Sequence, residues 1–200
     1  MDLGSHTINE LVASLASKQP TPGGGAVAGL LAALSTSLGQ MVLAYTQGKK
    51  KYAEHESLHT DCISFLQKAS DDALLLANED ADAYEALNML WKLEKNDPTR
   101  IERWEDALAK AIQVPLQTME LSERILTSLQ TLQGKTNVML SSDLIIAGIL
   151  AESAARSARL NVEINLNQMV ESDAKNALQS KTSDLLASCK FACKSIEDGC

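Results

Sequence analysis

Two prolines and three consecutive glycines precede a long apolar segment in the stretch PTPGGGAVAGLLAALSTSLGQMVLAYTQG, Pro20–Gly48. No charged residue occurs from Gln19 to Gly48. Residues 26–46 are about long enough to cross a bilayer, but their Ser, Thr and Gln side chains are poorly suited to lipid. A helix that is apolar on all sides is typical of the centre of a bundle. We therefore predict that 26–46 is the buried helix around which a soluble protein folds.

Helical periodicity continues on both sides of this segment. Thr7 and Glu10 form a capping box for the first helix. In the helix expected over residues 99–132, Pro115 is expected to cause a kink or a break, and Gly134 is expected to form the C-cap. The expected helices cover residues 8–15, 26–46, 50–78, 79–93, 99–132, a segment capped by Ser141, Ser142 or Asp143, and 172–196. No alternating apolar run indicates a strand. We predict an all-α fold, with a single domain over residues 1–200 built as an up-and-down helical bundle.

Composition limits the class of protein further. Hydrophobic residues make up 45% of the chain and aromatic residues only 4%, so the core is built from helix-forming aliphatic side chains. A net charge of −8 argues against nucleic-acid binding. The first residues, MDLGSHTINE, lack the features of a signal peptide, and four cysteines without paired spacing suit reduced thiols. We expect a cytoplasmic protein that binds neither membranes nor nucleic acid.

The triplet Gly23, Gly24 and Gly25 is the first candidate binding feature. It is not a Walker A loop, because no Gly-Lys-Ser/Thr follows, and it is not a dinucleotide fingerprint, because no strand precedes it. At a helix N-terminus the unpaired backbone N–H groups favour an anion or a carbonyl group. The alternative interpretation is a tight turn between two closely packed helices.

Two charged clusters are further candidates. Lys49, Lys50 and Lys51 form the only dense basic cluster of the chain. They stand at a predicted helix start, where the helix dipole disfavours cations, and this placement suggests an anionic ligand. Asp80 and Tyr84 lie one helical turn apart, and a carboxylate among apolar neighbours can act as an acid or a base because its pKa rises. Solvated helix starts are the alternative for both clusters.

The sequence HESLH, His55–His59, matches the H-E-x-x-H pattern of zinc metalloproteases. Only one other histidine, His6, is available, and the motif lies among charged residues that indicate a solvated helix face. Cys189 and Cys193 are four residues apart on the last helix with no histidine near them in sequence, which favours core or interface thiols. We therefore expect no metal site.

Several motifs occur together in the order found in a known family. They are LASKQPTPGGGAVAG (15–29), YTQGKKKYAEHE (45–56), EDADAYEAL (79–87), VPL (114–116), SDLIIAGILA (142–151) and LNVEINL (160–166). Through these motifs the chain resembles the cyclodeaminase/cyclohydrolase family of folate enzymes from about residue 8 to 166. The resemblance implies an all-α homodimer that binds a tetrahydrofolate derivative as substrate, in a cleft, with no other cofactor.

The resemblance also implies site residues. The acidic catalytic residue of the family falls on Asp80. Roles in substrate binding fall on Gly23, Gly24, Gly25, Lys49, Lys50, Lys51, Asn137, Ser142 and Asp143. Asn78 and the segment WKLEKND at 91–97 depart from the family pattern, which leaves substrate preference open.

Two reactions follow from the resemblance, and both pass through a tetrahedral carbon between N5 and N10 of the folate. The first expectation is a methenyltetrahydrofolate cyclohydrolase, which hydrolyses 5,10-methenyltetrahydrofolate to the 10-formyl product. The alternative is a formiminotetrahydrofolate cyclodeaminase, which releases ammonia as the ring closes. A folate-binding relative without activity is the third possibility. Either reaction needs a proton carrier, for which Asp80 is the candidate, and the lysines suit the carboxylates of the folate tail or of its polyglutamate extension.

Overall fold

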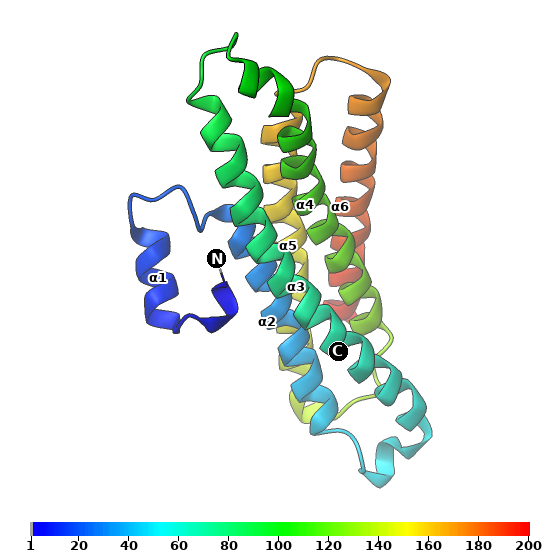
Figure 1. Ribbon diagram of the computed structural model, residues 1–200. Helices are drawn as coiled ribbons and strands as arrows, with labels where there is room; N and C mark the ends of the chain where they lie inside the picture. The colour runs from blue at the N-terminus through cyan, green and yellow to red at the C-terminus, as the bar shows by residue number, and fades with distance from the viewer. Residues whose placement is uncertain (1) are drawn as a thin grey trace.

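The computed structural model describes residues 2–200, and its helices are joined by short connections without any strand in that range (Figure 1). The α-helices are α1 (Ile8–Ala16), α2 (Gly24–Ala44), α3 (Glu56–Trp91), α4 (Pro98–Gln130), α5 (Ser141–Leu166) and α6 (Asp173–Gly199). Three short 3-10 helices complete them: η1 (Leu3–Ser5), η2 (Lys50–His55) and η3 (Val138–Leu140). Helices α2 to α6 run up and down beside one another, which confirms the predicted all-α bundle.

Helix α3 corrects one expectation about the middle of the chain. Two helices were expected, with a break at Asn78, but α3 is continuous from Glu56 to Trp91. Nothing in its sequence breaks it, because it contains neither glycine nor proline. The Asn78 side chain instead accepts a hydrogen bond of 2.8 Å from the backbone N–H of Leu3. Residues 50–55, also expected to be α-helical, form the 3-10 helix η2.

The start of α5 corrects a second expectation. The residue that precedes the helix is Leu140, and no side chain caps it. The Ser141 hydroxyl donates to the carbonyl of Val138 at 3.0 Å, and Asn137 caps η3 through the backbone N–H of Met139. The predicted oxygens of residues 141–143 therefore lie in the first turn of α5 and do not cap it. By contrast, the capping box of Thr7 and Glu10 is confirmed at α1.

Helix α2 packs closely against α3 because two glycines leave room for its neighbours. A Cβ atom on Gly29 would lie 2.8 Å from the carbonyl oxygen of Ala73 and 2.8 Å from the Cβ of Ala77, both on α3. A Cβ on Gly39 would lie 2.8 Å from Leu129 of α4. The glycines thus set the distance between α2 and α3, and with it the position of the α2 N-terminus.

We predict that Gly29→Ala lowers the free energy of unfolding by about 1–3 kcal/mol, as overpacking does in other cores. The backbone of α3 must move, since two of the nearest atoms belong to it. Urea unfolding of the two proteins measures the difference. The control is Gly148→Ala, whose new methyl group meets only the side chain of Ile196, at 3.2 Å. An equal effect of both substitutions would contradict this account of the packing.

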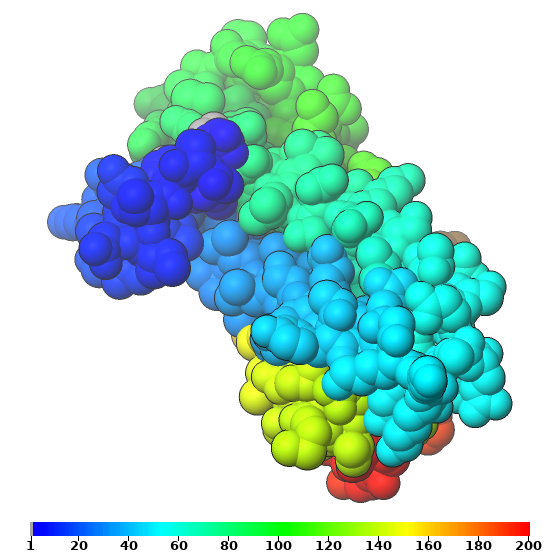
Figure 2. All heavy atoms as spheres, turned by 90° about the horizontal axis from the view of Figure 1, so that it is seen from below, coloured from blue at the N-terminus to red at the C-terminus, as the bar shows by residue number. Residues whose placement is uncertain are grey.

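Helix α2 is not buried on all sides, contrary to expectation. Eleven of its residues are buried, but Leu34 is 55% exposed, and Tyr45, just after the helix, is 62% exposed. The stretches Gly24–Ala44 and Val138–Leu166 are long and apolar enough to cross a membrane, a property shared by core helices of soluble proteins. Helix α1 has no buried residue and stands beside the bundle (Figures 1 and 2).

Candidate active site

The first turn of α2 presents unpaired backbone donors. Gly23 precedes the helix in an extended conformation, and no side chain of its own caps the turn. The first backbone hydrogen bond of the helix runs from the N–H of Val27 to the carbonyl of Gly23, at 3.1 Å. The N–H groups of Gly24, Gly25 and Ala26 therefore lack partners within the helix, at the positive end of its dipole.

The carboxylate of Asp80 occupies this position from the neighbouring helix α3. A Cβ atom on Gly25 would overlap all three terminal atoms of the Asp80 side chain. The N–H of Ala26 donates a hydrogen bond to the carboxylate. Asp80 thus caps α2 from outside the helix, and only a glycine at position 25 leaves room for it.

Burial gives the Asp80 carboxyl group an unusual pKa. Removal from water raises its pKa from 3.8 to about 6, although the hydrogen bond from Ala26 acts in the opposite direction. An acid with a pKa near 6 can both take up and release a proton near neutral pH, which is the property required of a general acid or base.

We predict that Asp80→Asn stabilises the folded protein at pH 7.5 by up to about 3 kcal/mol. The pKa of Asp80 is higher in the folded than in the unfolded state, so ionisation of this group destabilises the fold. That penalty is complete above about pH 6 and absent below pH 3.8, where the group is protonated in both states. Urea unfolding at pH 7.5 and pH 4 should therefore show a gain that disappears at the lower pH. A gain of equal size at both pH values would contradict this.

A polar residue of α5 also lies at this end of α2. Asn161 on α5 lies beside Gly24, with its amide 3.7 Å from the position of a Cβ on that glycine, and it donates to the Ser157 carbonyl at 3.1 Å. Tyr84, one turn after Asp80, is 41% exposed, and its ring meets that of Trp91 edge to face at 6.4 Å. Sequence reasoning did not single out Asn161, although it lies in the motif LNVEINL.

The remaining predicted residues gather at the other end of α2. The backbone N–H of Asn137 donates to the Thr46 hydroxyl at 3.0 Å, and that of Val138 donates to the Tyr52 hydroxyl at 3.2 Å. These bonds place the segment before α5 beside the loop that carries Lys49, Lys50 and Lys51. The three lysines are exposed, and so is Ser142, whereas Asp143 is half-buried.

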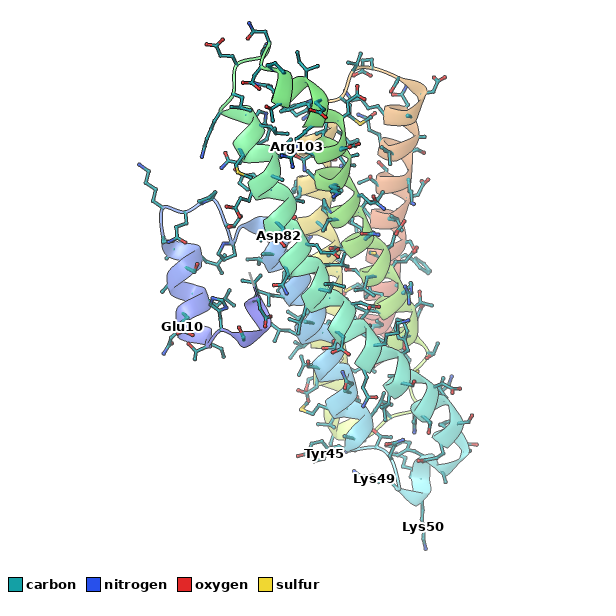
Figure 3. The ribbon with its side chains drawn as sticks, in the orientation of Figure 1. Glu10, Tyr45, Lys49, Lys50, Asp82 and Arg103 are labelled. Atoms are coloured by element: carbon teal, nitrogen blue, oxygen red, sulfur yellow. The ribbon has the colours of Figure 1, made fainter. Side chains whose placement is uncertain are left out.

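The candidate residues therefore form two groups in one chain, not one site. Gly23, Gly24 and Gly25 lie with Asp80, but the lysines, Asn137, Ser142 and Asp143 lie at the opposite end of a helix of 21 residues, which spans about 30 Å. Figure 3 shows the separation, with Lys49 and Lys50 at one end of the bundle and Asp82 near its middle. Within one chain, these two groups of residues therefore do not line a common cleft.

His59, Cys189 and Cys193 are buried in the interior of the bundle. The buried His59 donates from Nε2 to the carbonyl of Lys135 at 2.8 Å. Across residues 2–200, no three side chains of His, Cys, Asp or Glu converge in a way that could hold a metal ion. Burial raises the pKa of Cys189 to about 12 and that of Cys193 to about 11. Both lie in the core, which confirms that they are core thiols.

A family model described as formiminotransferase-cyclodeaminase matches residues 7–184. The chain belongs to this family. The match includes both ends of α2 and the whole of α3, so both groups of candidate residues lie within it.

Within the formiminotransferase-cyclodeaminase family, curated relatives of this chain carry two different names. The methenyltetrahydrofolate cyclohydrolase of Methylorubrum extorquens is 32% identical over 169 residues, which cover 81% of this chain and 80% of that protein. The formimidoyltransferase-cyclodeaminase of Rattus norvegicus is 30% identical over 188 residues, which cover 92% of this chain and 35% of that protein. The chain therefore spans about a third of the rat relative and most of the bacterial one.

A solved structure has the same fold. The formiminotetrahydrofolate cyclodeaminase of Thermotoga maritima superposes with a TM-score of 0.88, over 98% of this chain and 96% of that one. The sequences are 24% identical, so the likeness is one of fold.

Proposed function

We propose that the protein is a methenyltetrahydrofolate cyclohydrolase, which hydrolyses 5,10-methenyltetrahydrofolate to 10-formyltetrahydrofolate. The observation that carries this proposal is the buried Asp80 carboxylate at the open first turn of α2, in a member of this family. The relative named for this reaction matches over 80% of its own length. By comparison, the match covers 35% of the rat formimidoyltransferase-cyclodeaminase.

The chemistry of the reaction fits the properties of this carboxylate. The carbon that bridges N5 and N10 belongs to a cationic amidinium, which an ionised Asp80 stabilises by charge. Water attacks this carbon, and Asp80 accepts a proton from the water as the new C–O bond forms. The tetrahedral intermediate then breaks its bond to N5, which takes the proton from Asp80. The hydroxyl group of the intermediate releases its remaining proton to solvent as the C=O bond forms, and the formyl group remains on N10. The bare backbone of residues 23–25 lets the flat pterin approach the free N–H groups.

The second candidate is a formiminotetrahydrofolate cyclodeaminase. It is favoured by the names of the rat relative and of the Thermotoga maritima structure. In that reaction N10 attacks the formimino carbon and ammonia leaves after taking a proton, for which Asp80 would again be the donor. A relative that binds folate without turnover is the third candidate.

The absorbance of the methenyl group distinguishes the three candidates. Purified protein is mixed with methenyltetrahydrofolate and, separately, with formiminotetrahydrofolate. The proposal predicts that absorbance falls faster than in buffer in the first mixture. A rise in the second mixture alone would assign the cyclodeaminase reaction instead. No change above the buffer rate in either mixture, with folate binding retained, would contradict both enzyme assignments.

We further propose that Lys49, Lys50 and Lys51 bind the anionic folate tail. Changing all three to Gln should raise KM while leaving kcat nearly unchanged, because the tail lies away from the reacting carbon. The increase should be larger for polyglutamylated than for monoglutamylated folate. The control changes Lys68, Lys190 and Lys194, which are also exposed, and so alters the net charge equally. The same increase for both folates, or in the control, would place tail binding elsewhere.

We also propose a cytoplasmic homodimer that needs no resident cofactor. The half-exposed apolar side of α2 supports the dimer, because monomers rarely leave large apolar patches in water. Sedimentation at micromolar concentration should show a species of twice the chain mass. A single species of 21.5 kDa would contradict the dimer.

A further inference from the structure

The tyrosine that follows the lysine cluster is buried, although the lysines themselves are not. Tyr52 lies in η2 and is 6% exposed, whereas Lys49, Lys50 and Lys51 are all exposed. The backbone N–H of Tyr52 donates to the carbonyl of Lys49 at 2.9 Å and so forms the first turn of η2. The cluster is therefore attached to a side chain that belongs to the interior of the protein.

A hydrogen bond from a distant part of the chain fixes the Tyr52 side chain. Its hydroxyl accepts from the backbone N–H of Val138, 86 residues later, at 3.2 Å. One residue earlier, the N–H of Asn137 donates to the hydroxyl of the buried Thr46 at 3.0 Å. The segment before α5 is thus bonded at two successive residues to the loop that carries the lysines. Burial and the bond from Val138 together set the orientation of the Tyr52 ring.

The ring in turn holds the ammonium group of Lys51. The Lys51 Nζ lies 5.2 Å from the centroid of the Tyr52 ring, within the range of about 6 Å over which a cation is attracted to an aromatic face. Across residues 2–200, the side chains of Lys49 and Lys50 form no hydrogen bond, ion pair or ring contact. Figure 3 shows Lys50 extending away from the bundle. Lys51 therefore has a preferred position that its two neighbours lack.

The acidity of Tyr52 agrees with this geometry. The pKa of its hydroxyl is lowered from the ordinary value of 10.0, first by the hydrogen bond from Val138 and also by the positive charges of Lys51 and Lys49. Burial acts in the opposite direction. The tyrosine thus lies in the positive field of the cluster, as the contact between the ammonium group and the ring requires.

We propose that Tyr52 is a positioning residue, which holds the Lys51 ammonium ready for an anionic group of the substrate and makes Lys51 contribute more to binding than Lys49 or Lys50. The identity of that group, a carboxylate of the folate tail, rests on the proposed function. An ammonium group has three N–H donors, so contact with the ring on one side leaves donors for a carboxylate on the other. A free side chain loses affinity when binding orders it, and Lys51 has given up that freedom beforehand.

Single substitutions of neighbouring lysines measure the difference. Lys51→Gln should raise KM for methenyltetrahydrofolate about two- to tenfold more than Lys50→Gln does, because ordering one long side chain costs about that factor. The effect should fall on KM and not on kcat. Both variants change the net charge equally at adjacent positions, so charge alone cannot separate them. An equal or larger effect of Lys50→Gln would overturn the proposal.

Substitutions of Tyr52 test whether the ring is the source of this difference. In a Tyr52→Leu background, adding Lys51→Gln should raise KM no more than adding Lys50→Gln does. Tyr52→Phe keeps the ring and loses only the acceptor for Val138, so most of the difference should remain. Loss of the difference in the Phe and Leu backgrounds alike, or its survival in both, would overturn the proposal.

NMR of Lys51 tests the positioning without reference to activity. Protons that lie over an aromatic face are shifted upfield, so the Hε protons of Lys51 should resonate upfield of those of Lys49 and Lys50. The resonance is identified by its loss in Lys51→Gln, and its shift should persist in Tyr52→Phe and vanish in Tyr52→Leu. An unshifted Lys51 in the wild type would overturn the proposal, even if Tyr52→Leu did not fold. If the wild type acted on neither folate, the proposed function would fail while this result still decided whether Tyr52 holds Lys51.

Discussion

We expect Asp80→Asn to lower kcat by about 10²–10⁴-fold, the usual contribution of a general acid or base. Asparagine has nearly the same shape and still accepts the hydrogen bond from Ala26, but it does not exchange a proton. Folate binding and the helical fold are therefore expected to change much less than turnover. The measurement is kcat on methenyltetrahydrofolate, with circular dichroism and thermal melting of the same preparation. The control is Asp71→Asn, which removes an exposed carboxylate from the same helix.

A different outcome would follow if Asp80 served only to cap α2. Loss of the charge at the helix N-terminus would then reduce stability by about 1 kcal/mol or less, with normal turnover. The proton-carrier account predicts the reverse, a variant that melts at or above the wild-type temperature and is nearly inactive. A variant that melted earlier and turned over normally would remove Asp80 from the mechanism and direct attention to Asp143.

We expect Gly25→Ala to lower kcat/KM by at least about 100-fold, although glycine itself carries no catalytic side chain. The added methyl group overlaps the carboxyl atoms of Asp80, so the carboxylate must leave its position at the first turn of α2. Displacement of a reacting group by about 1 Å can reduce the rate by two orders of magnitude. The measurement is kcat/KM, together with the pKa of Asp80 followed by NMR.

The neighbouring glycine supplies the matched control for this substitution. A methyl group on Gly24 meets only the Asn161 side chain, at 3.7 Å, which is an ordinary contact. Gly24→Ala should therefore leave Asp80 in place and lose much less activity than Gly25→Ala. It should also gain some helix stability, because alanine favours the helix over glycine. Equal loss of activity in both variants would show that any side chain in the triplet blocks folate, and the contact between Gly25 and Asp80 would lose its special role.

The helices were largely predictable because they depend on local signals. The capping box at Thr7, the apolar run of α2 and the position of Ser172 before α6 all follow from short-range patterns. The break expected at Asn78 failed for a different reason. Its side chain bonds to Leu3, 75 residues earlier, and a long-range contact of this kind leaves no periodic trace in the sequence.

The sequence named Gly25 and Asp80 as separate candidates, but it did not predict that they lie against each other. The pairing of Gly25 with Asp80 depends on how α2 packs on α3, which short motifs do not encode. The separation of Asp80 from Lys49–Lys51 depends on the length and direction of α2. Residues that belong to one motif set in the family thus lie at two ends of a single chain.

The central claim is that Asp80, with a pKa of about 6, carries the proton in the hydrolysis of methenyltetrahydrofolate. The most direct test is the pH dependence of kcat/KM for loss of the methenyl absorbance between pH 5 and 8. Water attack needs the ionised carboxylate, so the account predicts a rate that rises about tenfold per pH unit below pH 6 and levels off above it. In Asp80→Asn the same curve should be flat. A wild-type rate that does not change across pH 6, or a rise that persists in Asp80→Asn, would contradict the account.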